Sequence, residues 1–114
     1  MNRLSHEHVP EGLPKVLIPY DRKEAFSLAH AAEVAGRSVG TIRNWCIMHS
    51  LGRRVGGGPW EVSRVALAMF LDADEPALRA YHAGDRSSEI VAGYYRRLGI
   101  SGRSTTPQAR ISGS

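Results

Sequence analysis

The chain has only one cysteine, Cys46, among its 114 residues. A single thiol cannot form a disulfide within the chain or supply a cysteine-based zinc site, and it fits a reducing compartment. Long apolar runs are also missing, and the first fifteen residues are too polar for a signal peptide. These absences argue against a disulfide scaffold and a membrane-spanning protein, so we expect a cytoplasmic protein.

Lysine is scarce as well. The fifteen basic residues are thirteen arginines and two lysines, the formal net charge is +4, and the pI is near 9.7. Arginine binds phosphates and base edges with a planar pair of donors, so this composition favours a nucleic-acid partner. A GC-rich genome would give the same excess of arginine, and both interpretations stay open.

Recognisable catalytic patterns are absent too. The Gly-Gly-Gly-Pro stretch at residues 56–59 lacks the spacing and the lysine of a phosphate-binding loop. His6 and His8 flank Glu7 in a polar arm, and the other histidines have no partners at metal-ligand spacing. Because no carboxylate cluster or activated nucleophile is visible, we expect a protein that is not an enzyme and has no metal, no cofactor and no small-molecule substrate.

Two short helices with a tight connection dominate the middle of the chain. Ser27 and Ser38 are N-cap residues by type, and Gly36 ends the first helix. The spacing predicts helices over residues 28–35 and 39–49. We expect the second helix to bury Val39, Ile42, Trp45 or Cys46, and Met48. Helices joined so closely must cross steeply, as in a helix-turn-helix.

A glycine-tipped hairpin and a third helix follow. Residues 53–55 and 60–62 flank the glycines, which permit the turn, and Trp60 and Val62 are the expected anchors in the core. Ser63 caps a helix over residues 64–71, whose apolar side chains are expected to close the core. The prediction is a mainly α fold with a small β-hairpin wing, a winged helix-turn-helix, followed by C-terminal helices.

Residues 27–71 resemble the winged helix-turn-helix of the excisionase and MerR-like superfamily. The resemblance is carried by the Ala31-Ala32 pair, the turn from Gly36 to Ser38, Thr41 and Trp45 in the second helix, and the glycine-tipped wing. It implies a prokaryotic or phage DNA-binding protein whose second helix enters the major groove while the wing contacts the minor groove or the backbone. Since no long coiled-coil helix follows, the excisionase branch fits better.

The expected DNA contacts divide into two groups. Arginine and asparagine are the side chains that read guanine and adenine in the major groove, and the expected base contacts are Val39, Gly40, Arg43 and Asn44. The expected backbone contacts are Arg37, Ser38, Thr41, Trp45, Arg53, Arg54, Gly57 and Gly58. Of the two wing arginines we favour Arg54. A merely solvated helix face and a hairpin without contacts are the alternatives.

The flanking segments complete the predicted organisation. Residues 1–24 are expected to be a flexible arm, in which 16–18 form an edge strand or lie across the core; residues 25–72 are the DNA-binding domain. Helices near 77–83 and 89–98 follow, and residues 101–114 are a disordered basic tail. The second of these helices either packs on the domain or forms an oligomer interface through Ile90, Tyr94, Tyr95, Arg96 and Arg97.

These observations predict a sequence-selective binder of double-stranded DNA that acts architecturally. The resemblance implies an excisionase, or recombination directionality factor, that self-associates on attachment-site DNA and works with a site-specific integrase. We expect it to be associated with a prokaryotic nucleoid and not with a membrane. A small transcriptional regulator with the same domain is the first alternative, and a winged-helix adaptor between proteins is the second.

Overall fold

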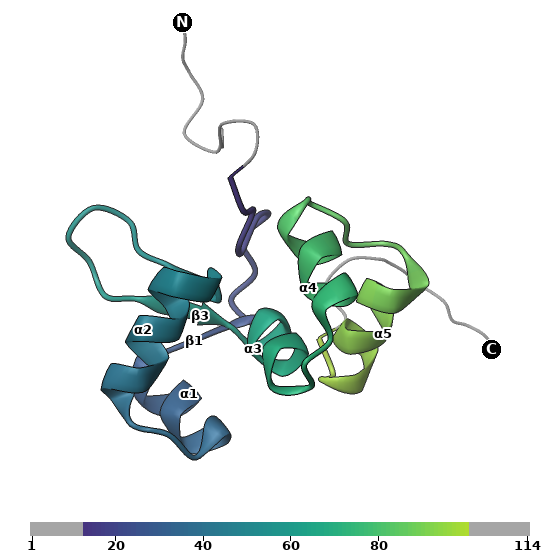
Figure 1. Cartoon of the computed structure of the whole chain (residues 1–114). Coiled ribbons are helices and arrows are strands. Elements are labelled where there is room, and N and C mark those ends of the chain that lie inside the picture. The colour runs from purple at the N-terminus through teal and green to yellow at the C-terminus, as the bar shows by residue number, and fades with distance from the viewer. Residues whose placement is uncertain (1–12, 101–114) are drawn as a thin grey trace, which may run out of the picture.

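The computed structural model describes residues 13–100. Within this range it contains five helices and a three-stranded antiparallel sheet (Figure 1), which confirms the prediction of a mainly helical fold with a small sheet. The predicted tail at 101–114 and the first half of the predicted arm lie outside the described residues. None of the helices in the described range combines the length and apolar character needed to cross a bilayer.

The first two helices begin and end where the sequence predicts. α1 spans Leu28–Ala35 and α2 spans Val39–His49. The Ser27 hydroxyl accepts from the His30 amide at 3.0 Å, and the Ser38 hydroxyl accepts from the Thr41 amide at 3.1 Å. Gly36 ends α1 at a φ of 70°, a left-handed conformation that glycine adopts without penalty. Capping serines and one glycine therefore set the connection between α1 and α2.

The sheet contains one strand that the sequence did not reveal. β2 (Gly52–Arg53) and β3 (Glu61–Ser63) form the expected hairpin, and β1 (Ala25–Phe26) pairs with the other edge of β3. Val62 is fully buried and Trp60 is half-buried against the core. β1 is only two residues long, so its sequence has no alternating pattern from which the strand could be predicted. Its pairing with β3 connects the start of α1 to the hairpin.

Gly52 lets the hairpin approach α2 closely. A Cβ at this position would lie 2.5 Å from the carbonyl oxygen of Glu61 and 2.9 Å from the sulfur of Cys46. Neither distance leaves room for a methyl group, and the first involves backbone that cannot rotate away. Because Gly52 has no side chain, the hairpin can lie directly against the inner face of α2.

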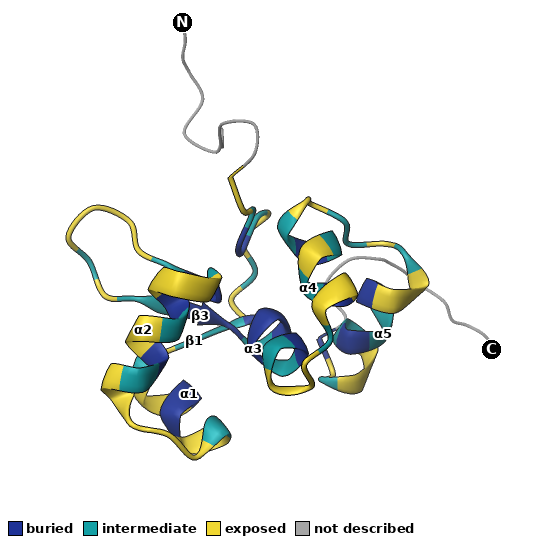
Figure 2. Ribbon diagram, in the orientation of Figure 1, coloured by how far each residue is buried: buried dark blue, intermediate teal, exposed yellow. Residues whose placement is uncertain are grey.

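Three further helices build the other half of the molecule. α3 (Arg64–Leu71), α4 (Glu75–His82) and α5 (Glu89–Arg97) pack on one another. Figure 2 shows buried residues concentrated on α3 and the adjoining strand. Leu71, expected in the core, is instead 45% exposed, and Met69 is buried in its place. Leu71 is the last residue of α3, so it projects beyond the helices that cover Val65 and Leu67.

The prediction of a flexible arm over residues 1–24 is wrong for its second half. Val16 and Leu17 are buried, and Glu24 is only 2% exposed. No strand forms at 16–18, so the alternative that this segment lies across the core is the one observed. The backbone amide of Leu17 donates to the Tyr81 hydroxyl at 2.9 Å, and the amide of Lys15 donates to the His82 carbonyl. The segment is thus attached to α4.

A buried carboxylate joins the two halves of the fold. Glu24 accepts hydrogen bonds from Ser63 at 2.6 Å, from Tyr95 at 2.9 Å and from Tyr81. We call these four residues the Glu24 network. Burial, followed by the charge of Glu24, raises the pKa of both tyrosine hydroxyls, so they remain protonated donors. The network connects the residue before β1 with β3, α4 and α5.

Cys46 is expected to be unreactive in the folded protein. Burial raises the pKa of its thiol from 9.0 to about 11, which lowers the thiolate fraction at pH 8 by about 100-fold. Alkylation by iodoacetamide at pH 8 should therefore be at least about 100-fold slower in buffer than in denaturant. Equal rates would contradict the burial of Cys46. The folded protein favours the protonated thiol, and this contributes to the free energy of unfolding. The contribution is fully present below pH 9.0 and is lost as the pH rises towards about 11.

Candidate nucleic-acid interface

α2 has one buried face and one exposed face. Ile42 and Cys46, four residues apart, are buried against the rest of the fold. The prediction that Val39 and Met48 are buried is wrong, because they are 40% and 72% exposed. Met48 lies about 200° around the helix from Cys46 and so points away from the core. The outer face of α2, as we use the term, consists of Val39, Gly40, Arg43, Asn44, Ile47 and Met48.

Two side chains on this face suit base edges. Arg43 and Asn44 are exposed, and within residues 13–100 neither side chain forms a hydrogen bond or an ion pair. Their donors and acceptors are therefore available to a ligand. Arginine pairs with guanine and asparagine with adenine through two parallel hydrogen bonds. The structure thus brings together the predicted base contacts Arg43, Asn44, Gly40 and Val39 on one surface.

Gly40 lies in the open on this surface. A Cβ added here would meet only the Ser38 hydroxyl, at 3.9 Å. Among the described residues, tight packing therefore does not explain a glycine at this helical position. The open space leaves room for a ligand to approach the α2 backbone closely.

The start of α2 offers further donors. A helix leaves its first amide groups without partners in the helix, and Ser38 occupies only that of Thr41. The Ser38 hydroxyl donates to the Thr41 hydroxyl at 3.0 Å. The amides of Val39 and Gly40 and the Thr41 hydroxyl form a set of donors suited to a phosphate oxygen.

Trp45 has a structural role that limits its predicted contact with DNA. The centre of its ring lies 4.8 Å from that of Phe70 in α3 and 5.9 Å from the Arg37 guanidinium. The tryptophan is half-buried, whereas Arg37 is exposed. Trp45 therefore packs α2 on α3 and positions Arg37 beside the start of α2.

The hairpin loop is braced by one of its own arginines. Arg54 donates from Nε to the Gly58 carbonyl at 2.7 Å and from a terminal nitrogen to the Gly57 carbonyl at 3.4 Å. Arg54, the wing arginine favoured as a DNA contact, thus has some of its donors occupied within the loop. Gly56 has a φ of 59° at the tip. The loop between β2 and β3 thus presents backbone and the charged Arg54 side chain held against it, with Arg53 at its base.

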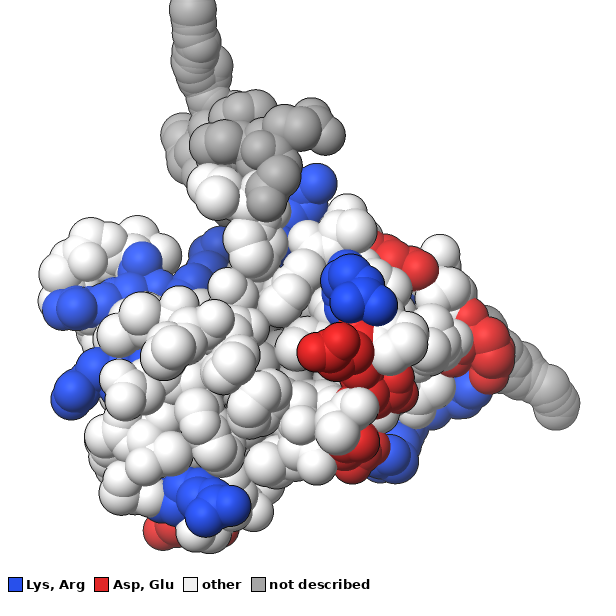
Figure 3. Space-filling model, viewed as in Figure 1, with Lys and Arg blue, Asp and Glu red and all other residues white. Residues whose placement is uncertain are grey.

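Basic charge gathers on this half of the molecule. Figure 3 shows blue side chains around the hairpin and at the edges of α2, whereas red side chains gather, with blue ones among them, over α4 and α5. Between residues 37 and 64 five arginines face a single acid, Glu61, whereas residues 72–97 contain five acids and four arginines. Four of these arginines, Arg37, Arg43, Arg53 and Arg54, lie on or beside α2 and the hairpin, whereas Arg64 begins α3.

The C-terminal helices hold the far end of α2. His82 Nε2 lies 2.8 Å from the carbonyl oxygen of Ser50, the residue that caps α2 in a left-handed conformation at φ 57°. A carbonyl only accepts, so Nε2 carries the hydrogen. Burial lowers the pKa of His82, which favours the neutral ring at this position. α4 therefore fixes where the exposed face of α2 ends.

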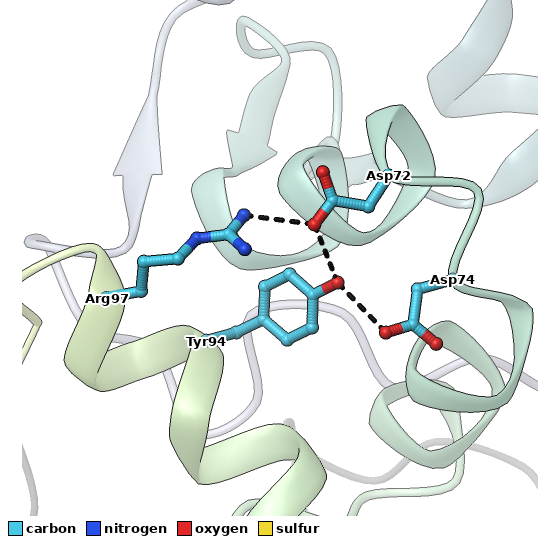
Figure 4. A network of polar contacts seen from close by, with 4 residues as sticks. All are labelled: Asp72, Asp74, Tyr94 and Arg97. Atoms are coloured by element: carbon cyan, nitrogen blue, oxygen red, sulfur yellow. Dashed lines mark hydrogen bonds and ion pairs between the residues drawn. The ribbon is translucent and has the colours of Figure 1, made fainter.

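The predicted oligomer interface on α5 is wrong for its tyrosines. Tyr94 is only 8% exposed, and its hydroxyl lies 2.8 Å from Asp72 and 2.9 Å from Asp74 (Figure 4). Burial, then these two carboxylates, raises the pKa of Tyr94, whereas the hydrogen bond from Tyr94 lowers that of Asp72. Tyr95 belongs to the Glu24 network. Both tyrosines attach α5 to the rest of the fold instead of facing a partner.

Three other members of that predicted set remain on the surface. Ile90 is 43% exposed, Arg96 pairs with Glu89, and Arg97 pairs with Asp72 at 3.1 Å. Sequence analysis missed Ile47, which is 59% exposed on the outer face of α2. Its position four residues after Arg43 is the signal that identifies it, since residues four apart share a face. Ile47 is an apolar group beside the predicted base contacts.

Within residues 13–100 no group of three or more His, Cys, Asp or Glu side chains is arranged to hold a metal ion. Comparison of the chain with protein-family models, with curated proteins and with solved structures gives no match. The argument for function therefore depends on the surface just described.

Proposed function

We propose that α1, α2, α3 and the hairpin form a winged helix-turn-helix and that the protein binds double-stranded DNA with sequence selectivity. The observation that carries this proposal is the outer face of α2, where Arg43 and Asn44 are exposed without partners in residues 13–100 and basic charge surrounds them. The resemblance of residues 27–71 to the excisionase and MerR-like superfamily supports it. Its action is architectural, without catalysis.

The surface suggests how each group would act. α2 enters the major groove, where Arg43 and Asn44 read base edges and Ile47 and Val39 contact thymine methyl groups. The start of α2 and Arg37 bind phosphates on one side. Arg53 and the glycine loop, braced by Arg54, approach the neighbouring backbone as the wing.

Salt dependence tests this proposal directly. With about four to five phosphate contacts, the logarithm of the association constant should fall with the logarithm of salt concentration with a slope of about −4. Fluorescence anisotropy with a labelled duplex between about 50 and 200 mM salt measures this slope. A slope near zero, with weak binding, would refute DNA binding and favour the protein adaptor, for which the exposed Met48 and Val55 are the structural argument.

The biological role we propose is that of an excisionase, or recombination directionality factor. One winged helix reads few base pairs, so useful specificity needs several protomers on adjacent sites. We propose self-association on attachment-site DNA, with Ile90 as the exposed apolar contact, and cooperation with a site-specific integrase in a prokaryotic nucleoid. A transcriptional regulator would use the same DNA surface and differs in where on the genome it binds.

Gly40→Ala separates stability from DNA contact. Alanine should raise the free energy of unfolding by about 0.5–1 kcal/mol, because Gly40 lies in a helix with open space around it. The added methyl group should also weaken DNA binding if the α2 backbone approaches the duplex closely. Urea denaturation and anisotropy with one duplex measure the two effects. Unchanged DNA affinity in the stabilised variant would show that Gly40 does not serve close approach.

A further inference from the structure

A groove lies where α1, α3 and the end of α5 meet, and no residue of α2 or the hairpin lines it. α3 lies between α1 and α5 in Figure 1, and the groove follows its exposed side. Its volume is about 210 Å³. The apolar lining is Phe26, Val34, Leu67, Leu71 and Leu98. We call this the α1–α3–α5 groove.

Within residues 13–100 the groove leaves apolar surface exposed. Val34 and Leu71 are 58% and 45% exposed, although both are large aliphatic side chains. Sites for whole small molecules have volumes of about 300–1,000 Å³. The smaller groove instead fits one or two apolar side chains, the size of anchor that a protein segment inserts into its partner.

Positive charge borders this apolar surface. Arg64 and Arg97 both line the groove, and Asp72 is the one acidic residue among its lining residues. Within residues 13–100 Arg64 forms no ion pair, and it donates to the Lys23 carbonyl at 3.1 Å. The Arg97–Asp72 pair has side chains 55% and 42% exposed, so it contributes little and can open. One net positive charge therefore remains beside an apolar surface.

This combination favours a carboxylate over a nucleic acid. A single Asp or Glu can accept charge-assisted hydrogen bonds from Arg64 and Arg97. A phosphate backbone would bring repeated negative charges against Asp72 and would leave the apolar lining uncovered. The chemistry thus matches an acidic side chain next to a large apolar one.

We propose that the α1–α3–α5 groove binds a segment of a partner protein in which a large apolar side chain lies beside an Asp or Glu. The apolar side chain inserts between Val34 and Leu71, and the carboxylate accepts from Arg64 and Arg97. Because the groove shares no residue with the outer face of α2, the partner segment and DNA bind at the same time. The groove proposal does not depend on DNA binding.

A selection with the full-length protein tests this proposal. A random dodecapeptide library displayed on phage is selected on the immobilised chain, and enriched peptides are resynthesised with a fluorophore for anisotropy titrations. We expect the enriched peptides to share an apolar residue within two positions of an Asp or Glu. Val34→Asp and Arg97→Glu should each weaken their binding by at least about tenfold. Leu13→Asp, a matched change at an apolar residue that is 53% exposed and lies outside the groove, should leave it unchanged.

Other outcomes would overturn the proposal. The proposal fails if no peptides are enriched, or if the enriched peptides lack acidic residues. It also fails if Leu13→Asp weakens peptide binding as much as the groove variants do, provided that circular dichroism shows that all variants are folded. If Val34→Asp converts an associated wild-type protein into a monomer, the occupant is a second copy of this chain. If Val34→Asp and Arg97→Glu weaken duplex binding as much as Arg43→Ala does, the groove contacts nucleic acid. If the protein bound no DNA but still selected these peptides, the proposed function would fail and the groove proposal would stand.

Discussion

Glu24→Ala is expected to lower the free energy of unfolding by about 2–4 kcal/mol. The substitution removes the common acceptor of Ser63, Tyr81 and Tyr95 and leaves their hydroxyls buried without it. An unsatisfied buried polar group costs about 1–3 kcal/mol, and local rearrangement recovers part of the sum. Urea denaturation followed by the fluorescence of Trp45 and Trp60 measures the loss.

Two variants control this experiment. Glu24→Gln keeps the shape and one acceptor oxygen, so it should be clearly less destabilising than Glu24→Ala. Glu33→Ala removes an exposed carboxylate from α1 and should stay within about 0.5 kcal/mol of the wild type. If Glu24→Ala behaved like Glu33→Ala, the Glu24 network would not be what joins β3, α4 and α5.

Arg43→Ala and Asn44→Ala are expected to relax sequence preference. Each should weaken binding to the preferred duplex by about 10-fold to 100-fold, because a bidentate contact to a base contributes about 1–3 kcal/mol of discrimination. Binding to random duplexes should change much less. The preferred sequence is first obtained by selecting from randomised duplexes with the wild-type protein, and both affinities are then measured at one salt concentration.

Matched arginine variants complete the comparison. Arg53→Ala should weaken preferred and random duplexes alike, as expected for a phosphate contact. Arg54→Ala should do the same and also loosen the hairpin loop, since Arg54 bonds to Gly57 and Gly58. Arg79→Ala, on α4 and paired only with the exposed Glu75, should have no effect on DNA binding. If Arg43→Ala and Arg79→Ala lowered DNA affinity equally, DNA binding would depend on the net charge of the protein and not on a specific contact by Arg43.

Local signals in the sequence predicted much of the fold. Ser27, Ser38 and Ser63 cap helices as their residue types indicate, and Gly36 ends α1, because capping depends on neighbours within three residues. Contacts between distant residues could not be predicted in the same way. Glu24 looks like an ordinary charged residue until Tyr81 and Tyr95, more than fifty positions away, are placed against it.

In the candidate site, too, local patterns could be predicted from the sequence and contacts between distant residues could not. The sequence predicts Ile42 in the core and Arg43 and Asn44 as ligand contacts, and in the structure Ile42 is buried while Arg43 and Asn44 are exposed. The sequence leaves open whether Tyr94 packs on the domain or faces a partner, because an aromatic ring fits an interface as well as a core. Only the folded chain shows that Asp72 and Asp74 surround its hydroxyl. The bracing of the hairpin by Arg54 likewise depends on a loop conformation that no periodic pattern encodes.

The most direct test of sequence-selective DNA binding is a gel-shift titration of the protein against fragments from around its own gene, with excess random competitor at physiological salt. The account predicts a competitor-resistant shift that develops into a ladder of cooperative complexes on one fragment. A single compact complex on a palindromic promoter would indicate a dimeric regulator instead of an excisionase. Absence of any competitor-resistant shift would contradict sequence-selective DNA binding itself.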